Sequence, residues 1–387
     1  MAFHLDRFKI HAFRQLKGLE LKGLGRVNLL VGANNSGKTT VLEAIAAHCQ
    51  PLEPMAWLEI ARRREIKSSR EPILDSIKWL FPQTGSSDVD DPYFQGRVQM
   101  EAEGTTPNLE TIATYEGFIG ERPDDEADWE SENGVATTPD PSSYRERGAR
   151  IHLSTTVRTF DSLIYMATPD PEGKATCDEE FELWESRAFK APMREDSTPK
   201  SPTATVSPFA HRVEPLQVSQ WSKLRHAGIA ESDLLNAARL IDPEIEGFEL
   251  LDRTGIRSSL FVKHRITGLT PVSVLGDGLR RAIAIALNLF AARDGVLLID
   301  EIESAIHKDG LGTLFGWLTK MAQQHNVQLF VTTHSLEAVD ALVEARFRQD
   351  DGLLTGFRLP KTNSGEIVAR YSGSSLDELR HGGLEVR

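Results

Sequence analysis

Short unbroken apolar runs, separated by glycine turns and amphipathic stretches, mark both ends of the chain. Residues 26–31 (Arg-Val-Asn-Leu-Leu-Val) predict a strand, and the apolar segment 41–47 after a glycine-rich turn predicts a helix. Residues 295–299 and 327–332 predict two more buried strands, because continuous apolar runs of this length are typical of strands covered on both faces. The pattern favours an α/β fold with a mostly parallel core sheet.

In the middle of the chain the hydrophobic pattern changes, and apolar and polar residues alternate. Three such segments, 97–102, 108–115 and 150–155, predict an antiparallel sheet beside the core. We expect this β subdomain to cover 61–175. An acidic stretch, rich in Asp, Glu, Gly and Pro, cannot bury a core, and it predicts a mobile loop near 117–148.

A Pro-, Ser- and Thr-rich segment at 192–208 predicts a linker, and the stretch 221–241 that follows predicts helix. We therefore expect 176–254 to hold a linker and a helical lobe. Residues 1–60 and 255–387 then form the core domain. No sustained heptad pattern occurs, so we expect no long coiled-coil arms.

Charge and composition exclude several classes of protein. The 387 residues include 57 Asp and Glu against 44 Lys and Arg, a formal net charge of −13, which argues against a surface that binds polyanions everywhere. The longest apolar stretch, 282–292, is shorter than the roughly 18 residues that a membrane span needs. Only Cys49 and Cys177 occur, too few for a disulfide framework or a zinc site. We expect a cytoplasmic protein with no membrane contact.

The turn between the first strand and the first helix has the spacing of a phosphate-binding loop, with Gly32, Gly37, Lys38 and Thr39 in register. Glycines let backbone N–H groups face the phosphates, at the positive end of the helix that follows. We expect Lys38 to reach the β- and γ-phosphates and Thr39 to bind Mg²⁺. The residues predicted to bind the nucleotide here are Gly32, Ala33, Asn34, Asn35, Ser36, Gly37, Lys38, Thr39 and Thr40.

A pair of carboxylates and a histidine follow the two later strands. Asp300 and Glu301 come directly after 295–299, at the strand end where open α/β sheets bind ligands. We expect Asp300 to lie on the metal side and Glu301 to be the catalytic base. His334 follows 327–332 and is a candidate γ-phosphate contact and catalytic residue.

A glycine turn at 273–278 opens a helix ahead of Asp300, and a helix N-terminus is a second anion site. The order of the motifs resembles the ABC-type ATPase heads of the RecF, SMC and OLD group. More closely, 277–287, 298–303 and 331–335 look like the AAA15-type ATPases of that group, of the kind found in bacterial antiphage defence. The resemblance covers the first 50 residues and 271–342, under half of the chain.

The resemblance implies a P-loop NTPase with an ABC-type ATPase head that binds ATP and Mg²⁺. It also implies a head-to-tail homodimer that encloses two ATP molecules, and it leaves open whether dimers assemble into higher oligomers. It implies that Ser273, Gly276 and Gly278 contact ATP across the dimer, although Gly276-Asp-Gly278 replaces the usual Ser-Gly-Gly. It also implies that Ser304 to His307 crosses the dimer. Arg14 matches the family's N-terminal arginine near the nucleotide.

The functional hypothesis is an Mg²⁺-dependent ATPase whose dimer is switched by nucleotide, in phage defence or DNA surveillance, with a separately encoded effector such as a TOPRIM-type nuclease. We expect no nuclease domain in this chain. The alternative is a RecF-like ATP-clamped repair protein, which would use the basic cluster Arg62–Arg64, Lys67 and Arg70 to contact DNA. A transporter subunit is less compatible with the glycine turn, and a GTPase lacks an Asn-Lys-x-Asp element.

Overall fold

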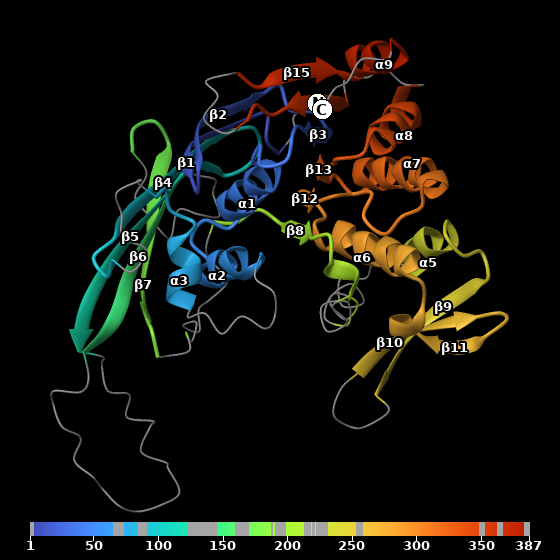
Figure 1. Cartoon of the computed structure of the whole chain (residues 1–387), viewed down its shortest axis with the longest axis horizontal. Helices are drawn as coiled ribbons and strands as arrows, with labels where there is room; N and C mark the ends of the chain where they lie inside the picture. The colour runs from blue at the N-terminus through green and yellow to red at the C-terminus, as the bar shows by residue number, and fades with distance from the viewer. Residues whose placement is uncertain are drawn as a thin grey trace, which may run out of the picture.

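The computed structural model describes residues 4–64, 73–83, 91–121, 145–158, 170–186, 189, 199–212, 218, 221, 231–252, 258–347, 353–361 and 367–382. Two six-stranded sheets lie on either side of the helix that follows the phosphate-binding loop, and a small three-stranded sheet stands at the far end (Figure 1). Within these residues, no helix has the length and apolar character needed to cross a bilayer.

The core sheet has the order β15-β14-β3-β13-β12-β8. Five strands run parallel: β3 (Val27–Val31), β8 (Thr203–Val206), β12 (Val296–Ile299), β13 (Gln328–Thr332) and β14 (Leu354–Arg358). The edge strand β15 (Ala369–Ser372) pairs antiparallel with β14. Every residue of β3, β12 and β13 is buried, as expected for strands covered on both faces. Because these strands pair in parallel, their carboxyl ends meet at one edge of the sheet.

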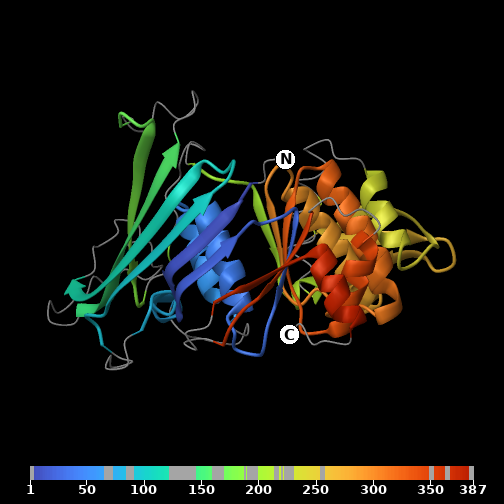
Figure 2. The same cartoon turned by 90° about the horizontal axis from the view of Figure 1, so that it is seen from above.

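Helices cover both faces of the core sheet. Figure 2 shows α1 (Lys38–Cys49) on one face, and α6 (Asp277–Ala291), α7 (Lys308–Gln324) and α8 (Leu336–Phe347) on the other. The terminal helix α9 (Gly373–His381) packs against α8 and β15. Helix α6 carries eleven buried residues, and eight of them, all apolar, belong to the hydrophobic core on its face of the sheet. The predicted α/β fold is confirmed: the core sheet is mostly parallel, a glycine-containing loop joins β3 to α1, and an antiparallel sheet lies beside the core.

The second sheet is antiparallel and packs on the opposite side of α1, with the order β2-β1-β4-β5-β6-β7. Its strands are β1 (Arg7–Phe13), β2 (Leu16–Lys22), β4 (Gln95–Glu103), β5 (Asn108–Glu121), β6 (Arg145–Arg158) and β7 (Lys174–Trp184). Two short helices, α2 (Pro54–Arg62) and α3 (Ile73–Lys78), lie beside it. We call this sheet with α2 and α3 the β lobe.

The β lobe extends beyond the predicted 61–175 at both ends. Strands β1 and β2 belong to it, and β7 continues past residue 175. Both ends of the segment predicted as a mobile loop, 117–148, are strand instead, because β5 reaches Glu121 and β6 begins at Arg145. Residues 122–144 lie outside the described part.

The segment predicted as a linker and helical lobe holds more strand than expected. Within 192–208, β8 is a strand of the core sheet and pairs along β12, so this part is not a linker. Helix α5 (Glu231–Arg239) lies in the predicted helical stretch, but β9 (Ile245–Asp252) follows and pairs with β10 (Ser258–His264), which pairs with β11 (Gly268–Pro271). The strand β8 escaped detection because its Thr-Ala-Thr-Val sequence is too short to show a period.

Candidate functional site

The phosphate-binding loop joins β3 to α1 through backbone conformations that favour glycine. The φ angles of Gly32, Asn35 and Gly37 are 148°, 64° and 87°, and asparagine is the residue that best tolerates the left-handed region after glycine. A Cβ on Gly37 would lie 2.6 Å from Leu16 Cδ2, so the loop also sits directly against the turn between β1 and β2. The sequence pattern therefore produces a tight loop at the start of a helix.

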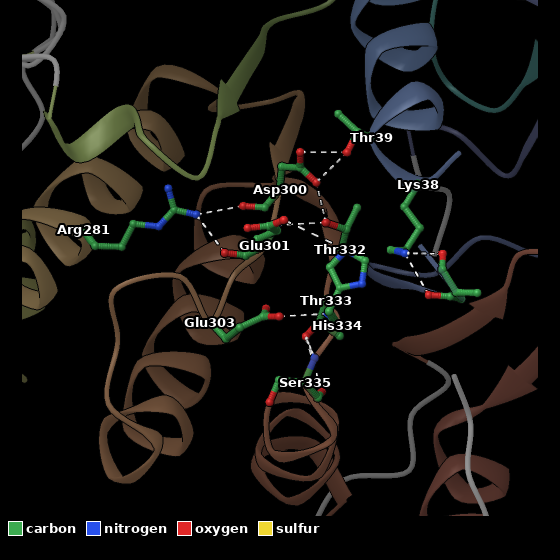
Figure 3. Close-up of polar contacts among 12 residues, drawn as sticks. Lys38, Thr39, Arg281, Asp300, Glu301, Glu303, Thr332, Thr333, His334 and Ser335 are labelled. Atoms are coloured by element: carbon green, nitrogen blue, oxygen red, sulfur yellow. Dashed lines mark hydrogen bonds and ion pairs between the residues drawn. The ribbon is translucent and has the colours of Figure 1, made fainter. Parts of the chain in front are cut away.

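The Lys38 side chain folds back over the loop. Its ammonium donates to the carbonyl oxygens of Gly32 at 2.8 Å and Ala33 at 3.0 Å (Figure 3). Burial lowers the pKa of Lys38, while the carboxylates of Asp300, Glu301 and Glu303 oppose that shift. A desolvated ammonium at the N-terminus of a helix suits a polyphosphate, because each oxygen of that ligand accepts hydrogen bonds.

Asp300 contacts residues from two other elements of the core. Thr39 Oγ1, in the first turn of α1, donates to Asp300 Oδ2 at 2.9 Å, and Thr332 Oγ1, at the end of β13, donates to Asp300 Oδ1 at 2.6 Å (Figure 3). A hydroxyl and a carboxylate held side by side are oxygen donors of the kind that Mg²⁺ binds. Ser36 Oγ is buried in the same loop and has no hydrogen-bond partner among the described residues. The donors present therefore fit a magnesium-bound polyphosphate.

Glu301 holds a backbone conformation that is unusual for its residue type. Its φ is 46°, and its amide donates to Thr332 Oγ1 at 2.9 Å. Burial, and then the neighbouring Asp300, raises the pKa of the Glu301 carboxyl, while His334 acts in the opposite direction. The Nε2 atom of His334 lies 4.0 Å from Glu301 Oε1, and its amide donates to Glu303 Oε1 at 2.8 Å.

A buried arginine holds the backbone of the two acidic residues. Arg281, on α6, is 0% exposed and donates through Nη2 to the carbonyl oxygens of Asp300 at 2.9 Å and Glu301 at 3.2 Å (Figure 3). Its Nη1 atom donates to the carbonyl oxygen of Ser207, directly after β8. The desolvation that accompanies full burial lowers the pKa of Arg281 to about 10. This side chain links α6, β8 and the end of β12 at one point.

A second buried carboxylate lies on the other side of the loop. Glu43 on α1 is completely buried and accepts from Arg14 Nε at 2.8 Å and from Arg64 Nη2 at 2.7 Å. Arg64 also donates to Thr40 Oγ1 at 2.9 Å. Paired in this way, the two guanidiniums stay at the edge of the phosphate-binding loop.

These residues surround one cavity of about 840 Å³, a size that accommodates a nucleoside triphosphate. The residues that line the cavity are Arg14, Gln15, Leu16, Asn34, Asn35, Ser36, Gly37, Lys38, Thr39, Thr40, Arg64, Trp79, Phe81, Gln83, Glu301 and His334.

The structure brings together most of the residues that the sequence singles out. The predicted loop residues, Arg14, Glu301 and His334 line the cavity or hold Lys38, and Asp300 contacts Thr39. Ser273, Gly276 and Gly278 do not line the cavity; they lie at and before the start of α6.

The sequence analysis does not assign Arg64, Trp79, Arg281 or Thr332 to the site, nor the cavity-lining residues Gln15, Leu16, Phe81 and Gln83. Arg64 belongs to the run read as a basic patch for DNA, and the residues around it, just after α2 ends at Arg62, give no local sign of a buried acidic partner. Arg281 stands beside Arg280 in the sequence, and nothing local distinguishes the buried one. A signal existed only for Thr332, which directly precedes Thr333 and His334 at a strand end.

Comparison with known proteins places the chain in a family. Residues 117–340 match the family described as "AAA domain, putative AbiEii toxin, Type IV TA system", a match that begins after the phosphate-binding loop and includes Ser273, Asp300 and His334. The chain belongs to this family of AAA-type ATPases.

Two individual relatives match the chain over different lengths. The chain is 43% identical over 115 residues to an uncharacterized protein of Methanocaldococcus jannaschii, which covers 29% of this chain and 99% of that protein. It is 21% identical over 389 residues to a protein of Helicobacter pylori named ATP/GTP phosphatase, which covers 96% of this chain and 97% of the relative.

The solved structures that match the chain include Smc head domains. One, bound to the C-winged helix domain of ScpA, has a TM-score of 0.44 at 10% identity and covers 95% of this chain and 97% of that one. Another, from Pyrococcus furiosus, has an extended coiled coil and is bound to the C-terminal domain of ScpA. It has a TM-score of 0.45 at 10% identity and covers 99% of both chains.

Proposed function

We propose that this chain is a Mg²⁺-dependent ATP hydrolase. One observation carries the proposal: Thr39 of the phosphate-binding loop and Asp300 at the end of β12 meet through a 2.9 Å hydrogen bond beside Lys38. Thr39 and Asp300 would hold Mg²⁺, directly or through its water shell, and the ion would offset the negative charge of the phosphates. The printed name of the Helicobacter pylori relative, ATP/GTP phosphatase, supports the same reaction class.

Glu301 is the residue best placed to act on the attacking water. Its pKa is raised by burial, which moves a carboxylate toward the basicity that a general base needs at neutral pH. Thr332 and Arg281 fix its backbone, so the point from which the side chain extends is set before substrate binds. His334, 4.0 Å from Glu301, would contact the γ-phosphate and report its presence. Lys38 would stabilise charge on the transferred phosphoryl group.

The proposed nucleotide switch is a head-to-tail homodimer. Ser273, Gly276 and Gly278 lie at and before the N-terminus of α6, outside the cavity of their own chain, so they are available to complete the site of a second copy. A helix N-terminus favours anions, and the γ-phosphate is the anion that hydrolysis removes. ATP would therefore join two chains and hydrolysis would release them.

The proposed cellular role is a defence system with a separately encoded partner. The family description, a putative toxin of a toxin–antitoxin system, supports a two-component arrangement. The test is affinity capture of the Glu301→Gln protein from its native host, followed by analysis of protein and nucleic acid. A second protein in stoichiometric amount supports the proposal; DNA without such a protein supports the RecF-like clamp instead.

The RecF-like alternative relied on the cluster Arg62–Arg64, Lys67 and Arg70. Arg64 contacts Glu43 and Thr40 and lines the nucleotide cavity, so this side chain is engaged at the nucleotide site. Arg62 is exposed, and Lys67 and Arg70 lie outside the described residues. DNA binding stays a prediction, tested by DNA stimulation of ATP turnover in Arg62→Ala against the unchanged protein.

A further inference from the structure

A large aromatic side chain lies half exposed in the wall of the nucleotide cavity. Trp79 follows α3 and keeps 45% of its surface accessible, while Phe81, two residues later, is fully buried. Both line the cavity, but only Trp79 presents a large apolar surface that solvent reaches. A half-exposed indole in the wall of a cavity offers apolar surface that a ligand can cover, and covering it is favourable because apolar area leaves water.

The backbone of Trp79 is fixed to the same turn that supports the phosphate-binding loop. Its carbonyl oxygen accepts from Arg14 Nη1 at 3.2 Å, and the next carbonyl, that of Leu80, accepts from the Arg14 amide at 2.8 Å. The turn after Arg14 contacts the loop, since Leu16 lies against Gly37. The indole therefore stands on a tethered backbone rather than on an unattached loop.

The cavity has two chemically different sides. Glu301 and His334 come from the ends of core strands, close to the Lys38 ammonium, so the phosphates belong there. Trp79 and Arg14 come from the β lobe, on the other side of α1 (Figure 1). A nucleoside triphosphate is long and has a charged end and an aromatic end. With its phosphates at Lys38, its base extends toward the β lobe.

We propose that the indole of Trp79 is the platform on which the base of the nucleoside triphosphate stacks. This inference rests on the proposed nucleotide binding at the phosphate loop and adds the base-binding side of that site. Every purine has a π face, so stacking does not separate adenine from guanine. Trp79 therefore supplies affinity for a purine nucleotide as a class, and selectivity between purines comes from other contacts.

The test is calorimetric titration of ATP, GTP and inorganic tripolyphosphate, each with Mg²⁺, into the full chain carrying Glu301→Gln to prevent turnover. Trp79→Ala is added to this background, with Trp79→Phe as the matched control that keeps an aromatic ring. All variants retain the backbone carbonyl that holds Arg14. We expect Trp79→Ala to weaken ATP and GTP about ten-fold each, Trp79→Phe to weaken them less than three-fold, and tripolyphosphate to bind all variants equally.

The outcomes separate this inference from the function it rests on. Unchanged ATP affinity in Trp79→Ala overturns the stacking role and leaves nucleotide binding intact. An equal loss of ATP and tripolyphosphate also overturns it, because Trp79 would then act on the phosphate loop. Failure of the Glu301→Gln chain itself to bind ATP overturns the proposed function. A second measurement tests the contact directly: ATP should quench tryptophan emission, and Trp79→Phe should remove that quenching.

Discussion

Thr39 and Asp300 are 261 positions apart in the chain, yet Thr39 Oγ1 lies 2.9 Å from Asp300 Oδ2. The contact exists because β3 and β12 flank β13 in a parallel sheet, which brings the start of α1 and the end of β12 to the same edge. The hydroxyl and the carboxylate are thus assembled by the fold before any ligand arrives.

Removal of the Thr39 hydroxyl should weaken the binding of Mg²⁺. Thr39→Val is nearly isosteric but has no oxygen to offer, whereas Thr39→Ser keeps it. We expect Thr39→Val to raise the Mg²⁺ concentration for half-maximal ATP turnover at least ten-fold, and Thr39→Ser to change it little. Titration of Mg²⁺ at fixed ATP measures this. An equal Mg²⁺ dependence of turnover in Thr39→Val and the unchanged protein would contradict the assignment of Thr39 to the metal site.

Arg281 should be needed for both stability and turnover. Arg281→Met removes the donors to the carbonyl oxygens of Asp300 and Glu301, and we expect a loss of about 3 kcal/mol in the free energy of unfolding. Because the arginine fixes the backbone of Glu301, kcat should fall more than ATP affinity. Thermal unfolding and steady-state kinetics measure the two effects, with exposed Arg293→Met as the control. A fall in stability with unchanged kcat would make Arg281 structural only.

His48 should lower the free energy of unfolding at acidic pH. The ring is fully buried between Thr111 Oγ1 at 2.9 Å and the carbonyl oxygen of Asn108 at 3.2 Å, and burial lowers its pKa from 6.5 to about 4. Between these pH values the unfolded chain binds a proton that the folded chain excludes. The free energy of unfolding therefore falls as pH drops from 6.5 to 4, by about 3 kcal/mol for this group.

Urea unfolding at several pH values tests the His48 prediction. His48→Gln should flatten the dependence between pH 6.5 and 4, while exposed His381→Gln should leave it unchanged. Identical slopes in His48→Gln and the unchanged protein would assign the acid sensitivity to other groups.

A substitution at Gly276 should disrupt ATP-dependent dimerisation without disturbing the fold of the single chain. A Cβ at this position meets nothing within 4 Å, so Gly276→Glu should fold normally. In an ATP-joined dimer the added carboxylate would face the phosphates of the other chain and repel them. In the Glu301→Gln background, light scattering with ATP should report a dimer, and Gly276→Glu should leave a monomer. Gly312→Glu on α7, also without neighbours, is the control; a dimer that persists in Gly276→Glu speaks against the contact in trans.

The sequence alone was enough to predict the elements whose residues carry their own pattern. The apolar runs of β3, β12 and β13 are visible without a structure, and so are the loop glycines and the acidic pair after β12. In contrast, β8 depends on its pairing with β12, and β1 and β2 join the β lobe through pairing with β4. Those pairings are long-range, and no local period records them.

The site residues that the sequence analysis missed also depend on long-range contacts rather than on a local pattern. Arg64 lines the cavity because a fully buried Glu43 lies 21 positions earlier in the chain. Arg281 supports the site from behind, where three backbone carbonyl oxygens accept its hydrogen bonds. Trp79 reaches the cavity because Arg14 holds its carbonyl oxygen. Each role is decided by a partner that is distant in sequence, so residue type and spacing cannot reveal it.

The central claim is that Glu301 acts on the water that attacks ATP, and one pair of measurements tests it most directly. ATP turnover and ATP affinity are determined for the unchanged chain and for Glu301→Gln, which keeps the shape of the side chain and removes its charge. We predict that turnover falls by about 100-fold or more while affinity stays within about three-fold, because a base acts in the reaction and not in binding. Undiminished turnover in Glu301→Gln would contradict the account.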